Sequence, residues 1–131
     1  MSFGNEVAGM FNNVGWIIEG KIKKGREAEF KAIVDEMVDA TKKEGGTLNY
    51  QYYVTDDGKV LIYEHFKDSE SAHKHIDSWD AFAERWMAAA EPTRLVHLGD
   101  MPQELRERHS GLKSILYHPY AGFDRSEGKL H

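Results

Sequence analysis

Two strand-like runs separated by a tight turn constrain the fold of this chain more than any other feature. Leu48–Val54 and Val60–Phe66 are rich in aromatic and β-branched residues, which favour strands. Thr55-Asp56-Asp57-Gly58 separates them, and Asp-Gly is a strong hairpin signal because glycine accepts the positive φ that a tight turn requires. The sequence therefore predicts an antiparallel β-hairpin in the middle of the chain.

A helix is predicted before the hairpin, over Arg26 to Glu44. Apolar residues recur there at intervals of three and four, which places them on one helical face. This face comprises Phe30, Ile33, Val34, Met37, Val38 and Thr41. Lys42 and Lys43 are expected in the last turn, where the helix dipole favours cations, and Gly45-Gly46 is expected to end the helix.

A second helix is predicted after the hairpin. Asp68 or Ser69 is a suitable N-cap, because its side-chain oxygen can accept from free N–H groups of the first turn. The pattern allows an interruption near Asp77-Ser78, and Pro92 is expected to mark the end. The apolar positions at helical spacing are Ala72, His75, Ile76, Trp79, Phe82, Ala83 and Trp86.

Val14–Ile22 and Thr93–Gly99 are predicted as the first and fourth strands along the chain. The order β-α-β-β-α-β is typical of an α+β, ferredoxin-like fold with a four-stranded antiparallel sheet. We expect an N-terminal arm over residues 1–13, one domain over residues 14–100 and a C-terminal extension over residues 101–131. The extension is expected to pack on the domain or on a partner subunit.

The extension contains two predicted elements of its own. Gln103–Ser110 resembles a short charged helix that stops at Gly111, and Leu112–Tyr117 is a candidate for an extra strand.

In the domain, two helices can cover only one face of the sheet, so the other face presents apolar side chains. We therefore expect a homodimer that pairs through this open sheet face.

Composition excludes several classes of function. The formal net charge is -5 and the sequence pI is about 5.8, with no basic stripe, so no nucleic-acid partner is expected. There is no cysteine, which removes disulfides, thiolate metal sites and a cysteine nucleophile. No histidine spacing argues for a metal site. Without a long apolar run or a signal-peptide pattern, no membrane partner is expected and the cytoplasm is the default location.

Three segments together resemble a known family. They are Gly46–Val54, Val60–Phe66 and Ser69–His75, with a Gly-Thr-Leu-x-Tyr strand opening, a Tyr-Glu-x-aromatic strand end and a histidine one turn into the helix. These resemble the antibiotic biosynthesis monooxygenase domain of the quinol-monooxygenase type, and the similarity spans about Trp16 to Leu98. The resemblance implies a dimeric α+β barrel.

Members of this family oxidise polycyclic phenols or quinols with molecular oxygen and without a bound flavin or metal. The resemblance thus implies a cofactor-independent monooxygenase acting on a small aromatic or quinol-type substrate. Other members isomerise small hydroxyketones, degrade haem or have no known activity. The haem-degrading branch has a ligating histidine late in the second helix, and Phe82–Trp86 contains none. Two alternatives stay open: a non-catalytic binding or interaction protein, and an isomerase or lyase acting on a small carbonyl compound.

Glu64 and His75 are the candidate catalytic residues. The resemblance places Glu64 on the helix-covered side of its strand, where a desolvated carboxylate can act as a proton acceptor. His75 lies on the apolar helix stripe near the expected position of Glu64, and together they form a possible proton relay. Equally, Glu64 and His75 are compatible with structural roles as hydrogen-bonded core residues.

Aromatic residues are the candidate substrate-binding positions. They are Tyr52, Phe66, Trp79 and Trp86. The helical spacing of Trp79, Phe82 and Trp86 suits one wall of a flat aromatic pocket, and it also suits an ordinary core against the sheet. His97 and His118 are further candidates for a site shared between subunits.

Overall fold

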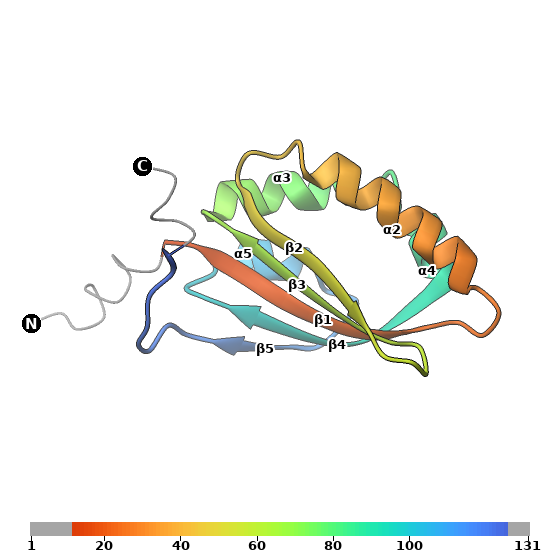
Figure 1. The fold of residues 1–131 in the computed structure, drawn as a ribbon. Coiled ribbons are helices and arrows are strands. Elements are labelled where there is room, and N and C mark those ends of the chain that lie inside the picture. The colour runs from red at the N-terminus through yellow and green to blue at the C-terminus, as the bar shows by residue number, and fades with distance from the viewer. Residues whose placement is uncertain (1–11, 126–131) are drawn as a thin grey trace, which may run out of the picture.

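A computed structural model describes residues 12–125, which form one twisted five-stranded sheet with helices on one face (Figure 1). The strand order is β2-β3-β1-β4-β5. The elements are β1 (Val14–Ile22), α2 (Glu27–Thr41), β2 (Thr47–Val54), β3 (Lys59–Phe66), α3 (Ser69–Trp79), α4 (Ala83–Ala89), β4 (Ala90–Leu98), α5 (Gln103–Glu107) and β5 (Ser114–Tyr117). The predicted arm over residues 1–13 lies almost wholly outside the described residues.

The central hairpin is confirmed. Gly58 has a φ of 88°, and its N–H donates to the Thr55 carbonyl over 3.1 Å, which closes the turn. The register then pairs Tyr52 with Ile62 and Tyr50 with Glu64. Because side chains alternate along a strand, this register directs these four residues to the same, helix-covered face.

The first helix ends earlier than the sequence predicted. α2 stops at Thr41, so Lys42 and Lys43 lie beyond the helix rather than in its last turn. Backbone N–H groups of both lysines still donate to the carbonyls of Val38 and Ala40, which satisfies the free end of the helix. The early end places Glu44 in the connection to β2, with its side chain free to reach another element.

The second helix is divided into two, and its predicted end is wrong. α3 stops at Trp79 and α4 begins at Ala83, slightly later than the expected interruption. Asp68 caps α3 as predicted, accepting from the Ser71 N–H over 2.8 Å. Pro92 lies inside β4 rather than after a helix. The sheet tolerates it because β4 is an edge strand there: β5 pairs only with Leu95 to Leu98.

Gly46 is required by a close approach between the β2 connection and α3. A Cβ atom at Gly46 would lie 2.0 Å from Ser71 Oγ and 2.5 Å from Ser71 Cβ, while one at Gly45 would meet nothing within 4 Å. The Gly46 carbonyl also accepts from the Lys67 N–H over 2.9 Å. This contact holds the end of β3 against the segment that carries Glu44.

We expect Gly46→Ala to lower the free energy of unfolding by about 1–3 kcal/mol, because the added methyl group forces α3 or the loop to move. Neighbouring Gly45→Ala is the matched control and is expected to change it by less than about 0.5 kcal/mol. Urea titration followed by circular dichroism measures both values. Equal effects of the two substitutions would show that the packing against Ser71 is not the reason for the glycine.

Residues 101–125 of the C-terminal extension pack on the domain. α5 lies on the helix-covered side of the sheet, where Leu105 is fully buried in a core cluster with Trp16 and Ala72. β5 then adds to the edge of the sheet parallel to β4. The extra strand is confirmed, and it converts the predicted four-stranded antiparallel sheet into a mixed sheet of five strands. The predicted helix ends at Glu107 instead of Ser110.

The face of the sheet opposite the helices carries apolar side chains, as the alternation predicted. Their exposed fractions include 54% for Tyr53, 38% for Leu61, 52% for Ile115 and 52% for Tyr117. Between the sheet and the helices lie two core clusters, one around Phe30 and Trp86 and the other around Trp16 and Phe66.

Candidate active site

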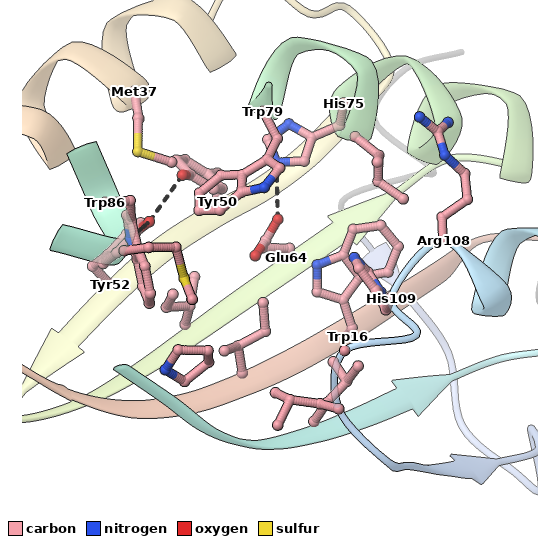
Figure 2. A pocket seen from close by; sticks show the side chains of 18 of the residues that line it. Trp16, Met37, Tyr50, Tyr52, Glu64, His75, Trp79, Trp86, Arg108 and His109 are labelled. Atoms are coloured by element: carbon pink, nitrogen blue, oxygen red, sulfur yellow. Dashed lines mark hydrogen bonds and ion pairs between the residues drawn. The ribbon is translucent and has the colours of Figure 1, made fainter. Parts of the chain in front are cut away.

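A cavity of about 470 Å³ lies between the sheet and the helices, with Glu64 and His75 in its wall (Figure 2). Strands β1 to β4, helices α2, α3 and α4, and the segment after α5 all contribute to the lining. The side chains are mostly apolar or aromatic, and the acid–base groups are few. Such a combination is typical of sites for small organic ligands.

His75 is held between two carboxylates. Its Nε2 lies 2.9 Å from Glu64 Oε1 and its Nδ1 lies 2.8 Å from Glu44 Oε1. His75 and Glu64 are buried, and their exposed fractions are only 7% and 5%. A ring that donates to a carboxylate from each nitrogen is an imidazolium, since a neutral ring has only one N–H.

Glu44 is itself fixed by two hydroxyl groups. Thr47 Oγ1 donates to Glu44 Oε1 over 2.9 Å, and Ser78 Oγ donates to Glu44 Oε2 over 2.8 Å. Glu44 thus connects the start of β2 to α3 and holds the His75 ring in one orientation. No sequence pattern pointed to Glu44, which was predicted as the last residue of the helix that begins at Arg26.

The charge of His75 follows from its surroundings. Burial favours the neutral ring, but the hydrogen bonds and negative charges of Glu64 and Glu44 outweigh burial and raise the pKa of His75. The contact of each His75 nitrogen with a glutamate side chain favours the imidazolium form of the ring beside Glu64. This pair can accept a proton at Glu64 and return one from His75.

One wall of the cavity is aromatic. The hydroxyl groups of Tyr50 and Tyr52 lie 3.0 Å apart, and Trp86 Nε1 donates to Tyr52 Oη over 3.2 Å. Burial and the nearby Glu64 charge raise the pKa of both tyrosines, so both hydroxyl groups keep their protons. Trp79 packs edge-on against Trp86, with ring centroids 5.7 Å apart.

The structure brings most of the predicted site residues together. Glu64, His75, Tyr52, Trp79 and Trp86 all line the cavity. Phe66 does not. It is fully buried behind the cavity wall, with its ring centroid 4.7 Å from that of Trp16 and 5.2 Å from that of His75, so it supports the site from the core.

The C-terminal extension completes the opposite wall. Trp16 and His109 lie on the other side of Glu64 from Tyr52 and Trp86 (Figure 2). Neighbouring Arg108 ties the extension to α3, since it donates to Asp77 Oδ1 over 2.6 Å and to the His73 carbonyl over 3.1 Å. No sequence signal had linked these residues to the cavity.

His97, a candidate in the sequence, is fully buried and in contact with His109 rather than with Glu64. His118 lies on the surface, 3.3 Å from Asp100. Within residues 12–125, no three histidine or acidic side chains converge as a metal-ion site would require. No helix of this part of the chain is both long and apolar enough to cross a membrane.

Comparison with family models identifies the domain that carries the cavity. The model described as antibiotic biosynthesis monooxygenase matches residues 14–85, which is more than half of the chain. The chain belongs to the antibiotic biosynthesis monooxygenase family. Glu64, His75 and Glu44 all lie within the matched family domain, and His97 and His109 lie outside it. No curated protein sequence matches the chain.

Solved structures share the fold of this family member. SnoaB, a cofactor-independent oxygenase from Streptomyces nogalater, is 11% identical, with a TM-score of 0.57 over 65% of this chain and 91% of that one. Rv0793 from Mycobacterium tuberculosis is 18% identical, with a TM-score of 0.60 over 69% of this chain and 96% of that one. Both similarities extend over about the length of one domain and not over the whole chain.

MupZ from Pseudomonas fluorescens has a longer similarity to this family member. It is 18% identical, with a TM-score of 0.74 over 90% of this chain and 93% of that one. A similarity of this extent reaches past the family domain into the C-terminal extension. The extension, which supplies one wall of the cavity, is therefore part of a fold that another protein of known structure also has.

Proposed function

We propose that this protein is a cofactor-independent oxygenase that acts on a small phenol- or quinol-type aromatic compound in the cavity. The single observation that carries the proposal is the buried Glu64–His75–Glu44 array at an aromatic cavity of about 470 Å³. Family membership and the fold shared with SnoaB, an oxygenase without a cofactor, support the choice of reaction.

The proposed reaction begins with removal of a phenolic proton by Glu64. The resulting anion is electron-rich and transfers an electron to dioxygen, and the two radicals combine to form a carbon–oxygen bond. The ring peroxide then takes a proton from the Glu64–His75 pair, and its oxygen–oxygen bond breaks. Loss of the ring hydrogen leaves a quinone carbonyl, so one oxygen atom enters the product and the other leaves as water.

The cavity suits such a substrate. Its volume falls in the range of about 300–1,000 Å³ that is typical of small-molecule sites. Trp79 and Trp86 offer flat aromatic surfaces, and protonated Tyr50 and Tyr52 offer hydroxyl groups. Water exclusion by these side chains strengthens the electrostatic effect of His75 on a developing anion.

Two other functions use the same features differently. A non-catalytic interaction protein has no need of an open cavity, so the space beside Glu64 favours a small-molecule site. A protein that only binds its ligand would use the same cavity without consuming oxygen. An isomerase or lyase acting on a small carbonyl compound would use the same Glu64–His75 pair for proton transfer without oxygen. Oxygen consumption separates this reaction from the proposed one.

A homodimer through the open sheet face is part of the proposal. The exposed apolar side chains there include Leu61, Ile115 and Tyr117, and such a surface is normally covered. We expect sedimentation equilibrium of the full chain to give twice the 15.0 kDa mass of the chain. A mass equal to that of one chain at micromolar concentration would contradict the dimer.

The activity is tested with purified protein and a panel of phenols, naphthols and hydroquinones in an oxygen electrode. The proposal predicts oxygen uptake for at least one aromatic compound, at a rate well above that of the Glu64→Gln variant. Uptake no faster than with this variant for any compound would contradict it. Conversion of a carbonyl compound without oxygen uptake would favour the isomerase instead.

A further inference from the structure

Two histidines outside the family domain form a chain of hydrogen bonds that ends at the cavity. His97 Nε2 lies 2.9 Å from His109 Nδ1, and the rings are stacked with centroids 5.2 Å apart. His97 Nδ1 lies 2.9 Å from Ser114 Oγ and 3.3 Å from Arg106 Nε. His97 lies on β4, and the other three residues belong to the extension, with Ser114 at the start of β5.

Arg106 determines the direction of these hydrogen bonds. A guanidinium group has donors only, so His97 Nδ1 must be the acceptor of the bond from Arg106 Nε. Arg106 Nη2 also donates to Ser114 Oγ over 2.8 Å. The Ser114 hydroxyl hydrogen is therefore free to point at His97 Nδ1, which is consistent with the same acceptor role.

The tautomer of His97 in turn determines the tautomer of His109. With Nδ1 unprotonated, neutral His97 carries its hydrogen on Nε2 and donates it to His109 Nδ1. His109 must accept at Nδ1 and so carries its own hydrogen on Nε2. Burial, reinforced by nearby positive charges, lowers the pKa of His97 and of His109 to about 4, so both rings are neutral at pH 7.

The Nε2–H group of His109 has no protein partner among residues 12–125. His109 lines the cavity, and its ring is packed edge-on to Trp16 with centroids 4.5 Å apart, which fixes its plane. Since Nδ1 faces His97, the opposite end of the ring is the one that can meet a ligand. Figure 2 shows His109 across the cavity from Trp86, with Glu64 between them.

We propose that His109 Nε2–H donates a hydrogen bond to a carbonyl or phenolate oxygen of the substrate, held in that state by His97, Ser114 and Arg106. This deepens the proposed function and rests on it for the role of Glu64. The substrate class narrows to aromatic compounds with at least two oxygen functions: one loses its proton to Glu64, and the other accepts from His109. A keto-phenol or a quinol meets this requirement.

A neutral, fixed donor suits this task better than a histidine that changes its charge. It stabilises negative charge that spreads to the second oxygen after deprotonation, and it does so without transferring a proton. His97 is a positioning residue, since it acts only through His109. Arg106 and Ser114 in turn fix the tautomer of His97.

The test uses the full-length protein and two ring compounds that differ in one oxygen. 1-Tetralone carries a carbonyl acceptor and tetralin lacks it. We expect 1-tetralone to shift the His109 Nε2 resonance in ¹⁵N-histidine NMR and tetralin not to shift it. The affinity ratio of the two compounds is expected to fall about 3- to 10-fold in His109→Leu, the loss typical of one hydrogen bond, and to be partly kept in His109→Gln. His118→Gln is the matched surface control.

The NMR spectrum also tests the positioning role. In the wild type, His109 is expected to show only the Nε2–H tautomer between pH 5.5 and 8, and in His97→Phe it is expected to populate both tautomers with a higher pKa. An unshifted His109 resonance with 1-tetralone in the wild type, or an unchanged affinity ratio in folded His109→Leu, would overturn the proposal. Neither readout depends on turnover, so a failed oxygen-uptake assay leaves this test intact.

Discussion

Glu64→Gln is expected to lower the rate of substrate oxidation about 10²- to 10⁴-fold, the usual contribution of a positioned general base. Glutamine keeps the shape of the side chain and its place beside His75, but it cannot accept the phenolic proton at neutral pH. Single-turnover oxygen uptake with saturating substrate measures the effect. Because the loss concerns the chemical step, the substrate affinity is expected to change much less than the rate.

Glu70→Gln provides the control for this substitution. Glu70 is a carboxylate of α3 that pairs with Lys74 on the surface, where its side chain is 78% exposed. Its removal is expected to leave the rate unchanged, while thermal unfolding shows whether each variant is folded. A folded Glu64→Gln variant with wild-type rate would remove Glu64 from the mechanism.

His75→Leu is expected to lower the free energy of unfolding by about 3–5 kcal/mol at pH 6, because it leaves two carboxylates without their buried cation. Glu64 Oε1 and Glu44 Oε1 both lose a hydrogen bond of less than 3 Å. Chemical denaturation measures the loss. His73→Leu, two positions earlier on the same helix, is the control, and its expected effect is below about 1 kcal/mol.

The pH dependence of this loss has a definite sign. Burial favours neutral His75, but Glu64 and Glu44 outweigh burial and raise its pKa above the ordinary value of 6.5. A group with a raised pKa stabilises the fold fully below its unfolded pKa and loses this effect as the pH rises through its folded pKa. The stability difference between the wild type and His75→Leu is therefore expected to narrow above pH 6.5. A constant difference from pH 6 to pH 9 would mean that His75 is not charged.

Much of the domain was predictable from local patterns. The hairpin, the strand over Val14–Ile22 and the start of α3 at Asp68 depend on turn chemistry, alternation and capping, which act over a few residues. The pairing of Glu64 with His75 was also predictable, because strand alternation and the helix stripe, with the family resemblance, directed both to one side of the sheet.

The remaining features depend on contacts between distant segments. Glu44 was missed because its partner His75 belongs to α3, and the helical pattern of α2 does not indicate a contact with a residue so distant in the sequence. Phe66 was misplaced because alternation gives the face of a strand but not the depth of a side chain in the core. No pattern in the sequence pointed to His109, because the prediction of a short charged helix does not indicate which part of the domain this region of the chain will contact.

The most direct test of the account is the fate of labelled oxygen. The purified protein is incubated under ¹⁸O₂ with the phenol or quinol that gives the fastest oxygen uptake, and the product is analysed by mass spectrometry. We predict one ¹⁸O atom in each quinone product of the wild type, and almost none in the same time with Glu64→Gln. Product formed without ¹⁸O, or formed equally fast by Glu64→Gln, would contradict the proposal that this cavity is an oxygenase site.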